Sequence, residues 1–316
     1  MTHSPTAAAA PSTNDARQFI AMTLGGALAI AAVAHGSSSA AAPLLTMATP
    51  TLATIAISWR SKALRRTWRA LGLRRAAPRH WPVALILPAF VAATSYGIAA
   101  IAGVLTYPRV DLGADSVING TLNLLAGLVI GTLFALSEEI GWRGFLLPAL
   151  QTTMPRTKAA LVTGFIHGIW HLPLILLTSS YDSVGSKWIV APIVVLNITL
   201  GGIIYAWLQN RSKSVWAVAV AHNAFNTFIE SLRRTAVTAT PATAAYVAGE
   251  SGIATTLAIA AIVAALVHRP TRHAQGPKVD ATTPLLHSTC ESGAGCSTIN
   301  WSSKAIAARL ENEDQV

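Results

Sequence analysis

Charged side chains are scarce in this chain. Only 11% of its 316 residues are Asp, Glu, Lys or Arg, whereas an average soluble domain has about 25%. Hydrophobic residues make up 52% of the sequence and form runs too long for the regularly spaced polar turns of a soluble α/β enzyme. The shortage of charge therefore argues against a soluble enzyme and predicts a polytopic membrane protein.

Cysteine is also nearly absent. The chain has only Cys290 and Cys296, which lie in a polar tail and lack the CxxC spacing, so we expect neither a disulfide framework nor a cysteine metal cluster. Acidic residues are fewer than basic ones, which gives a net charge of +10. In a soluble protein this charge would indicate nucleic acid binding. In a membrane protein it is explained by loops that face anionic lipid, so we expect no nucleic acid partner.

The long apolar runs predict an all-α fold, a polytopic transmembrane helical bundle of about eight spans. The spans are expected at residues 18–34, 41–58, 81–107, 117–145, 158–177, 188–208, 215–229 and 251–267. The first of them could instead be a cleaved signal peptide, because residues 32–34 resemble a cleavage site. We favour an uncleaved span, since the region before it is long and has a single basic residue, Arg17.

The bundle is expected to have polar segments around it. Residues 1–16 and 269–316 are predicted to be disordered. Residues 17–79 would contain the first two spans and a basic cytoplasmic loop, and residues 80–268 the main transmembrane domain. With eight spans, 16 of the basic residues up to Lys278 lie on one side of the membrane and four on the other. Because cytoplasmic loops carry the excess of Lys and Arg, we expect a multi-pass cell-membrane protein with both termini in the cytoplasm.

Two carboxylates and an arginine end the fourth apolar segment, in the sequence SEEIGWRG at residues 137–144. A charge at membrane depth costs at least about 2.5–3.5 kcal/mol. On a helix, Glu139 and Arg143 share a face and can pair, whereas Glu138 points about 100° away and is available for chemistry. The alternative is a charge cluster at the membrane surface that has no chemical role.

Further polar side chains lie in the fifth and seventh segments. His167 and His171 are four residues apart, and so are His222 and Asn226, so each pair shares a helix face. Ionisable groups inside a membrane are functional candidates. From the depths of these residues along their spans, we expect them to meet Glu138 in a cavity open to the cytoplasm.

This set of groups favours hydrolysis of an amide or ester. A glutamate in an apolar pocket suits a general base that acts on water, and imidazole and amide groups can orient that water and stabilise an oxyanion. A metal is the rival interpretation, because two His and one Glu can bind zinc and leave a position for water. Glu138, His171 and His222 would be the ligands, bridged from separate helices because the HExxH motif is absent. The sequence leaves zinc and no metal both open.

The order of these motifs resembles the CPBP family of CAAX-protease and bacteriocin-processing membrane proteins, also called Abi or type II CAAX prenyl endopeptidases. The resemblance rests on EExxxR at Glu138, WHLP at Trp170 and HxxxN at His222, and covers residues 80–232. It implies an all-helical, glutamate-dependent intramembrane endopeptidase. The family's second motif is usually Phe-x-x-x-His, and here His167 occupies the Phe position, which could add a ligand or alter the cavity.

The resemblance also implies roles for single residues. Glu138 would activate water, Glu139 and Arg143 would hold the site together, and His171 would orient the water. His222 and Asn226 would complete the site as an oxyanion hole. The expected substrate is a peptide or membrane protein cleaved near the cytoplasmic interface, in CAAX-box processing or in bacteriocin processing and immunity. The alternative function is a transporter or scaffold that uses the Glu and His residues as a proton or ion relay.

Overall fold

The computed structural model describes residues 11–62, 68, 71–73, 75–108, 113–179 and 185–268. Its helices are α1 (Thr13–Val33), α2 (Ala41–Arg60), η1 (Pro78–His80), α4 (Trp81–Ile101), α5 (Ala114–Gly141), η2 (Trp142–Leu146), α6 (Leu147–Gln151), α7 (Arg156–Leu177), α8 (Lys187–Ser212), α9 (Val215–Thr235), α10 (Pro241–Val247) and α11 (Ile253–Val267). No strand occurs among the described residues, apart from one isolated bridge between Thr106 and Val237. The predicted all-α transmembrane bundle is confirmed.

The eight predicted spans correspond to α1, α2, α4, α5, α7, α8, α9 and α11. Among the described residues, six helices are long and apolar enough to cross a membrane. They are the helices of the predicted spans other than α9 and α11. The α11 helix has 15 residues, whereas a span needs about 20. The α9 helix carries the polar residues of the third motif. The expected number of eight spans therefore stays a prediction.

The N-terminal boundary differs from the prediction. The α1 helix begins at Thr13, inside the segment that we expected to be disordered, because Ser12 and Asp15 form a reciprocal capping box. The two side chains satisfy amide groups at the helix N-terminus that otherwise have no partner. Residues 1–10, the tail from residue 269 and part of the basic loop lie outside the described residues.

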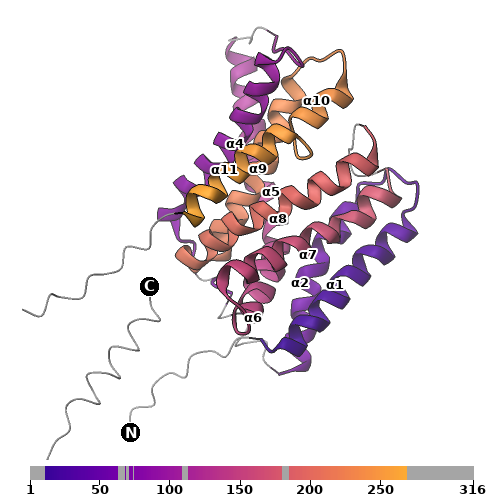
Figure 1. The fold of residues 1–316 in the computed structure, drawn as a ribbon, viewed down its shortest axis with the longest axis vertical. Helices are drawn as coiled ribbons and strands as arrows, with labels where there is room; N and C mark the ends of the chain where they lie inside the picture. Colours follow the sequence, from indigo (N-terminus) through magenta and orange to yellow (C-terminus); the bar gives the residue numbers. More distant parts are fainter. Residues whose placement is uncertain are drawn as a thin grey trace, which may run out of the picture. The chain divides into compact units, whose positions relative to one another are not determined.

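The helices pack so that distant motifs become neighbours. In Figure 1, α1, α7 and α8 run side by side, and α7 packs most extensively against α8. The α9 helix packs between α4 and α5, and α5 also contacts α2. The C-terminal end of α5 carries the start of the acidic motif; α5 packs against α2 and α9 and reaches α7 through Glu138.

Glycines allow the closest of these approaches. A Cβ atom at Gly164 would lie 2.7 Å from the carbonyl oxygen of Thr199, and one at Gly168 would lie 3.0 Å from the Cα atom of Val195. Since Thr199 and Val195 belong to α8, the backbones of α7 and α8 are almost in contact at these glycines. A small-residue pair on α7 thus has the packing role that this spacing indicates.

We expect Gly164→Ala to lower the free energy of unfolding by about 1–3 kcal/mol, the usual cost of overpacking a core. The added methyl group clashes with backbone atoms of α8, which cannot move aside as a flexible side chain could. Gly97→Ala in α4 is the matched control, since a Cβ there has nothing within 4 Å and alanine favours helix by up to about 1 kcal/mol. The midpoint temperature of thermal unfolding in detergent should fall for Gly164→Ala and rise for Gly97→Ala. An equal shift in both variants would contradict the close packing of α7 against α8.

Candidate active site

The acidic motif lies inside the protein. Glu138 is 2% exposed, and Glu139 and Arg143 are fully buried. The helix continues through the motif, but residues 142–146 form the wider π-helical turn η2, a feature often found at functional sites. A charge cluster at the membrane surface would have exposed side chains, so the burial of these three residues argues against that alternative.

Glu139 is the centre of a buried ion-pair network. Arg143 Nη1 donates to both of its carboxylate oxygens, at 2.9 and 3.1 Å, which confirms the pairing predicted from their spacing. On the other side, His222 Nδ1 lies 2.9 Å from Glu139 Oε1. The Tyr205 ring covers both partners, stacking on His222 at 5.7 Å and lying 5.0 Å from the Arg143 guanidinium carbon. One carboxylate thus links α5 and η2 to α9.

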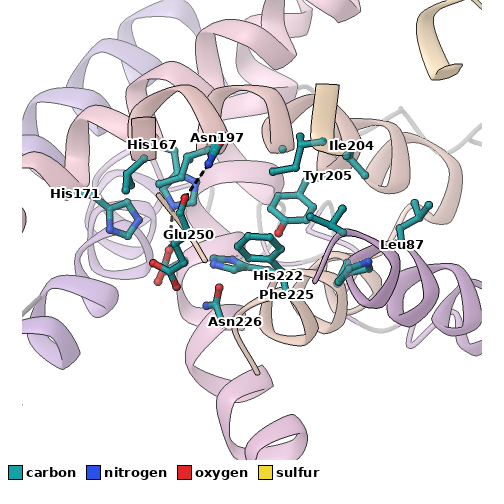
Figure 2. A pocket seen from close by; sticks show the side chains of 18 of the residues that line it. Leu87, His167, His171, Asn197, Ile204, Tyr205, His222, Phe225, Asn226 and Glu250 are labelled. Carbon is teal, nitrogen blue, oxygen red and sulfur yellow. Dashed lines mark hydrogen bonds and ion pairs between the residues drawn. The ribbon is translucent and has the colours of Figure 1, made fainter. Parts of the chain in front are cut away.

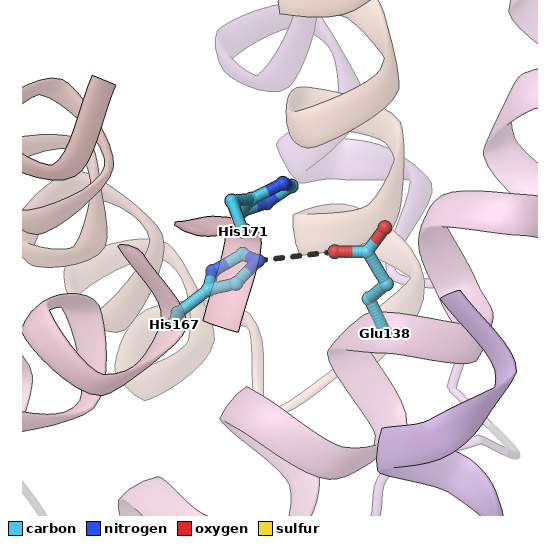
Figure 3. Close-up of side chains that lie close together, drawn as sticks. All are labelled: Glu138, His167 and His171. Atoms are coloured by element: carbon cyan, nitrogen blue, oxygen red, sulfur yellow. Dashed lines mark hydrogen bonds and ion pairs between the residues drawn. The ribbon is translucent and has the colours of Figure 1, made fainter. Parts of the chain in front are cut away.

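Glu138 points away from Arg143, as the helical period predicts, and contacts α7 instead. Its Oε2 atom lies 3.0 Å from Nε2 of His167 (Figure 3). The other ring nitrogen of His167, Nδ1, lies 3.2 Å from Arg143 Nη1. The His167 ring also stacks on Trp142, with 4.8 Å between the ring centroids. The sequence indicated that His167 could add a ligand or alter the cavity, but its contact with Glu138 was not predicted.

A cavity of about 240 Å³ brings the polar motifs together. Glu138, His171, His222 and Asn226 all line it, and so does His167. Figure 2 shows these side chains of α7 and α9 around one space, with Tyr205 and Phe225 beside them. Much of the remaining wall is apolar and comes from α4, α8 and α11, for example Leu87, Ile204 and Ile259. Polar groups are therefore gathered at one part of an otherwise apolar pocket.

Two asparagines at the site were not predicted. Asn223 Nδ2 donates to the carbonyl oxygens of Gly127 and Leu128 at 3.1 and 3.0 Å, and so joins α9 to α5. Gly131 makes room for it, because a Cβ there would lie 2.0 Å from Asn223 Oδ1. Asn197 donates to the backbone carbonyl of Glu250 at 2.8 Å in the wall of the cavity (Figure 2). A polar amide in an apolar segment is the sequence signal for both.

Three side chains could hold a metal ion. The ligand atoms of Glu138, His167 and His171 lie within 4.8 Å of one another, and two His with one Glu is a donor set that zinc uses. The set differs from the predicted one, because His167 takes the place of His222, whose Nδ1 atom faces Glu139. Whether the His167 ring can serve as a ligand depends on which of its nitrogens carries the proton.

Comparison with known proteins agrees with this geometry. Residues 119–228, which contain all three motifs, match the family described as "Type II CAAX prenyl endopeptidase Rce1-like". This part of the chain is therefore similar to type II CAAX prenyl endopeptidases, as the order of the motifs predicted. A relative described as CAAX prenyl protease 2, from Methanococcus maripaludis, is 35% identical over 91 residues, which are 27% of this chain and 33% of the relative. The chain thus spans about a third of the length of the curated relative that it matches.

Proposed function

We propose that this chain is an intramembrane endopeptidase of the CPBP type, in which Glu138 activates a water molecule that hydrolyses a peptide bond. One observation supports this proposal above the others: Glu138, His171, His222 and Asn226 line the same cavity. They come from three helices, so no local feature of the sequence forces them together. The family match to a type II CAAX prenyl endopeptidase agrees with a peptidase.

The first step is attack by water. The Glu138 carboxylate takes a proton from a water molecule, and the oxygen bonds to the carbonyl carbon of the substrate. His171, on the adjacent helix, orients this water. When the tetrahedral intermediate collapses, the carbon–nitrogen bond breaks and Glu138 returns the proton to the leaving amine. Glu138 therefore acts first as a base and then as an acid.

The negative charge that develops on the carbonyl oxygen needs hydrogen-bond donors. Asn226 offers its amide N–H groups from the cavity wall. A His222 ring with protons on both nitrogens donates Nδ1–H to Glu139, at 2.9 Å, and Nε2–H to the oxyanion. Glu139 and Arg143 do not touch the substrate in this mechanism; they hold His222 and the end of α5 in place.

The apolar walls indicate the class of substrate. A pocket lined by residues such as Leu87, Ile204 and Phe225 accepts apolar side chains or an apolar chain attached to a peptide. A CAAX-type peptide is the first candidate, and a bacteriocin or a membrane protein is the second. The predicted orientation, with both termini in the cytoplasm, puts the cleavage near the cytoplasmic interface.

We expect His171→Ala to lower peptide cleavage by roughly 100-fold, because the water loses the imidazole that orients it. The assay uses proteoliposomes, with peptide cleavage followed by mass spectrometry and proton flux followed by a pH-sensitive dye. His35→Ala is the matched control, since His35 is exposed and outside the cavity lining, and it should cleave normally. The wild-type chain could instead cleave no peptide and show a proton flux that His171→Ala abolishes. That result would reject the peptidase and favour the alternative function, a proton relay.

A further inference from the structure

His167 lies between two charged groups and contacts both. Its Nδ1 atom is 3.2 Å from Arg143 Nη1, and its Nε2 atom is 3.0 Å from Glu138 Oε2. The ring is 2% exposed, so both contacts are shielded from bulk water. Trp142 stacks on the ring at 4.8 Å and an interplanar angle of 25°, which fixes its plane. The ring is thus held in one orientation by its neighbours.

The contact with arginine decides where the ring carries its proton. A guanidinium group has only N–H donors and no acceptor, and arginine does not lose its charge in proteins. Arg143 Nη1 must therefore donate, and His167 Nδ1 must accept with its lone pair. A neutral imidazole has one protonated nitrogen, so the proton lies on Nε2. His167 then donates Nε2–H to Glu138, whichever protonation state Glu138 has.

The same contacts oppose metal binding by this ring. To bind a metal through Nε2, His167 would have to move its proton to Nδ1, where it would face the N–H of Arg143. Two donors would then meet at 3.2 Å in a buried place, and Arg143 already has two further buried nitrogens, Nε and Nη2, without a hydrogen-bond partner among the described residues. An unmade buried hydrogen bond costs about 1–3 kcal/mol, and more for a charged group.

We infer that His167 is a positioning residue for Glu138: it holds one carboxylate oxygen by Nε2–H, leaves the other to the water, and is not a metal ligand. Through Arg143, it also connects the catalytic carboxylate to the Glu139–His222 pair, in a continuous chain of hydrogen bonds across α5, η2, α7 and α9. The benefit for catalysis rests on the proposed function, whereas the position of the proton does not.

The first test is independent of activity. In protein labelled with ¹⁵N-histidine and purified in detergent, the His167 signals are assigned by their disappearance in His167→Gln. We expect a neutral ring with Nε2 protonated and Nδ1 unprotonated, and no change in its signals when Zn²⁺ is added. A ring protonated at Nδ1, or a zinc-dependent shift of Nε2, would overturn the inference. This result does not depend on activity. If the wild-type chain cleaves no peptide, the proposed function is wrong, but the inferred position of the proton on His167 is unaffected.

The second test compares two substitutions of the same ring. His167→Phe keeps an aromatic ring against Trp142 but loses both hydrogen bonds, whereas His167→Gln keeps an N–H that can reach Glu138 and an oxygen that accepts. We expect kcat to fall by up to roughly 100-fold in His167→Phe, the cost of a small misplacement of a reacting group, with KM within about twofold. His167→Gln should recover most of kcat.

Bound zinc separates positioning from ligation. The zinc content after incubation with Zn²⁺ should be the same in the wild type, His167→Phe and His167→Gln, measured on purified protein by mass spectrometry of the metal. If His167→Phe does not fold, His167→Gln alone distinguishes positioning from ligation. Glutamine can supply the N–H donor for Glu138, but it cannot supply the imidazole nitrogen that would bind zinc. Loss of both zinc and activity in His167→Gln would show that His167 is a ligand.

Discussion

Glu138→Gln is expected to lower kcat for peptide cleavage by about 10²–10⁴-fold, the contribution of a general acid–base group. Glutamine has the same shape and keeps an oxygen that accepts from His167 Nε2, whose distance to Glu138 Oε2 is 3.0 Å. It cannot take a proton from water. The fold should therefore survive while the chemistry is lost, and single-turnover kinetics on a cleaved peptide measures the difference.

The matched control for this substitution is Asp115→Asn. Asp115 lies in the first turn of the same helix, α5, and is exposed. The exchange again converts a carboxylate into its amide, but far along the helix from the cavity, and it should leave kcat unchanged. If Glu138→Gln retains more than about a tenth of the wild-type kcat, Glu138 is not the base.

Arg143→Met is expected to lower the free energy of unfolding by about 3–5 kcal/mol, the cost of breaking a buried ion pair. Arg143 and Glu139 are fully buried, and Arg143 Nη1 contacts both carboxylate oxygens at 2.9 and 3.1 Å. Removing the guanidinium leaves the Glu139 carboxylate buried with His222 as its remaining partner. Thermal unfolding in detergent is the measurement, and the double variant Glu139→Gln with Arg143→Met should lose less than the sum of the single variants.

The chain contains a matched ion pair on its surface. Arg233 donates to Glu230 at 2.7 and 2.9 Å, with the same charges at a similar helical spacing, but with 46% and 38% of the side chains exposed. Exposed pairs contribute about 0–1 kcal/mol, so Arg233→Met should have a small effect. Equal losses for Arg143→Met and Arg233→Met would show that the buried network does not stabilise the bundle.

Much of the fold could be predicted from the sequence, because apolar runs of about 20 residues have few alternatives to a membrane helix. The predicted boundaries failed where a local polar contact decides them, as in the capping box of Ser12 and Asp15 that starts α1 early. The π-helical turn at residues 142–146 was also missed, since hydropathy does not distinguish it from an ordinary α-helical turn.

The site was predictable at the level of motifs, because charged and imidazole side chains are costly in apolar segments and therefore mark functional candidates. The pairing of Glu139 with Arg143 followed from the helical period alone. The partners between helices did not, since the contact of His167 with Glu138 depends on how α7 rotates against α5. For the same reason, the candidate ligand set contains His167 where the sequence analysis proposed His222.

The most direct test of the central claim is a digest of a peptide library by the purified full chain in H₂¹⁸O, with prenylated and unprenylated peptides and with and without a chelator. We predict paired new termini from the wild-type chain, with ¹⁸O in each new carboxyl group, and none above background from Glu138→Gln. The absence of products from a folded wild-type chain, or the same products at the same rate from Glu138→Gln, would contradict the proposed role of Glu138.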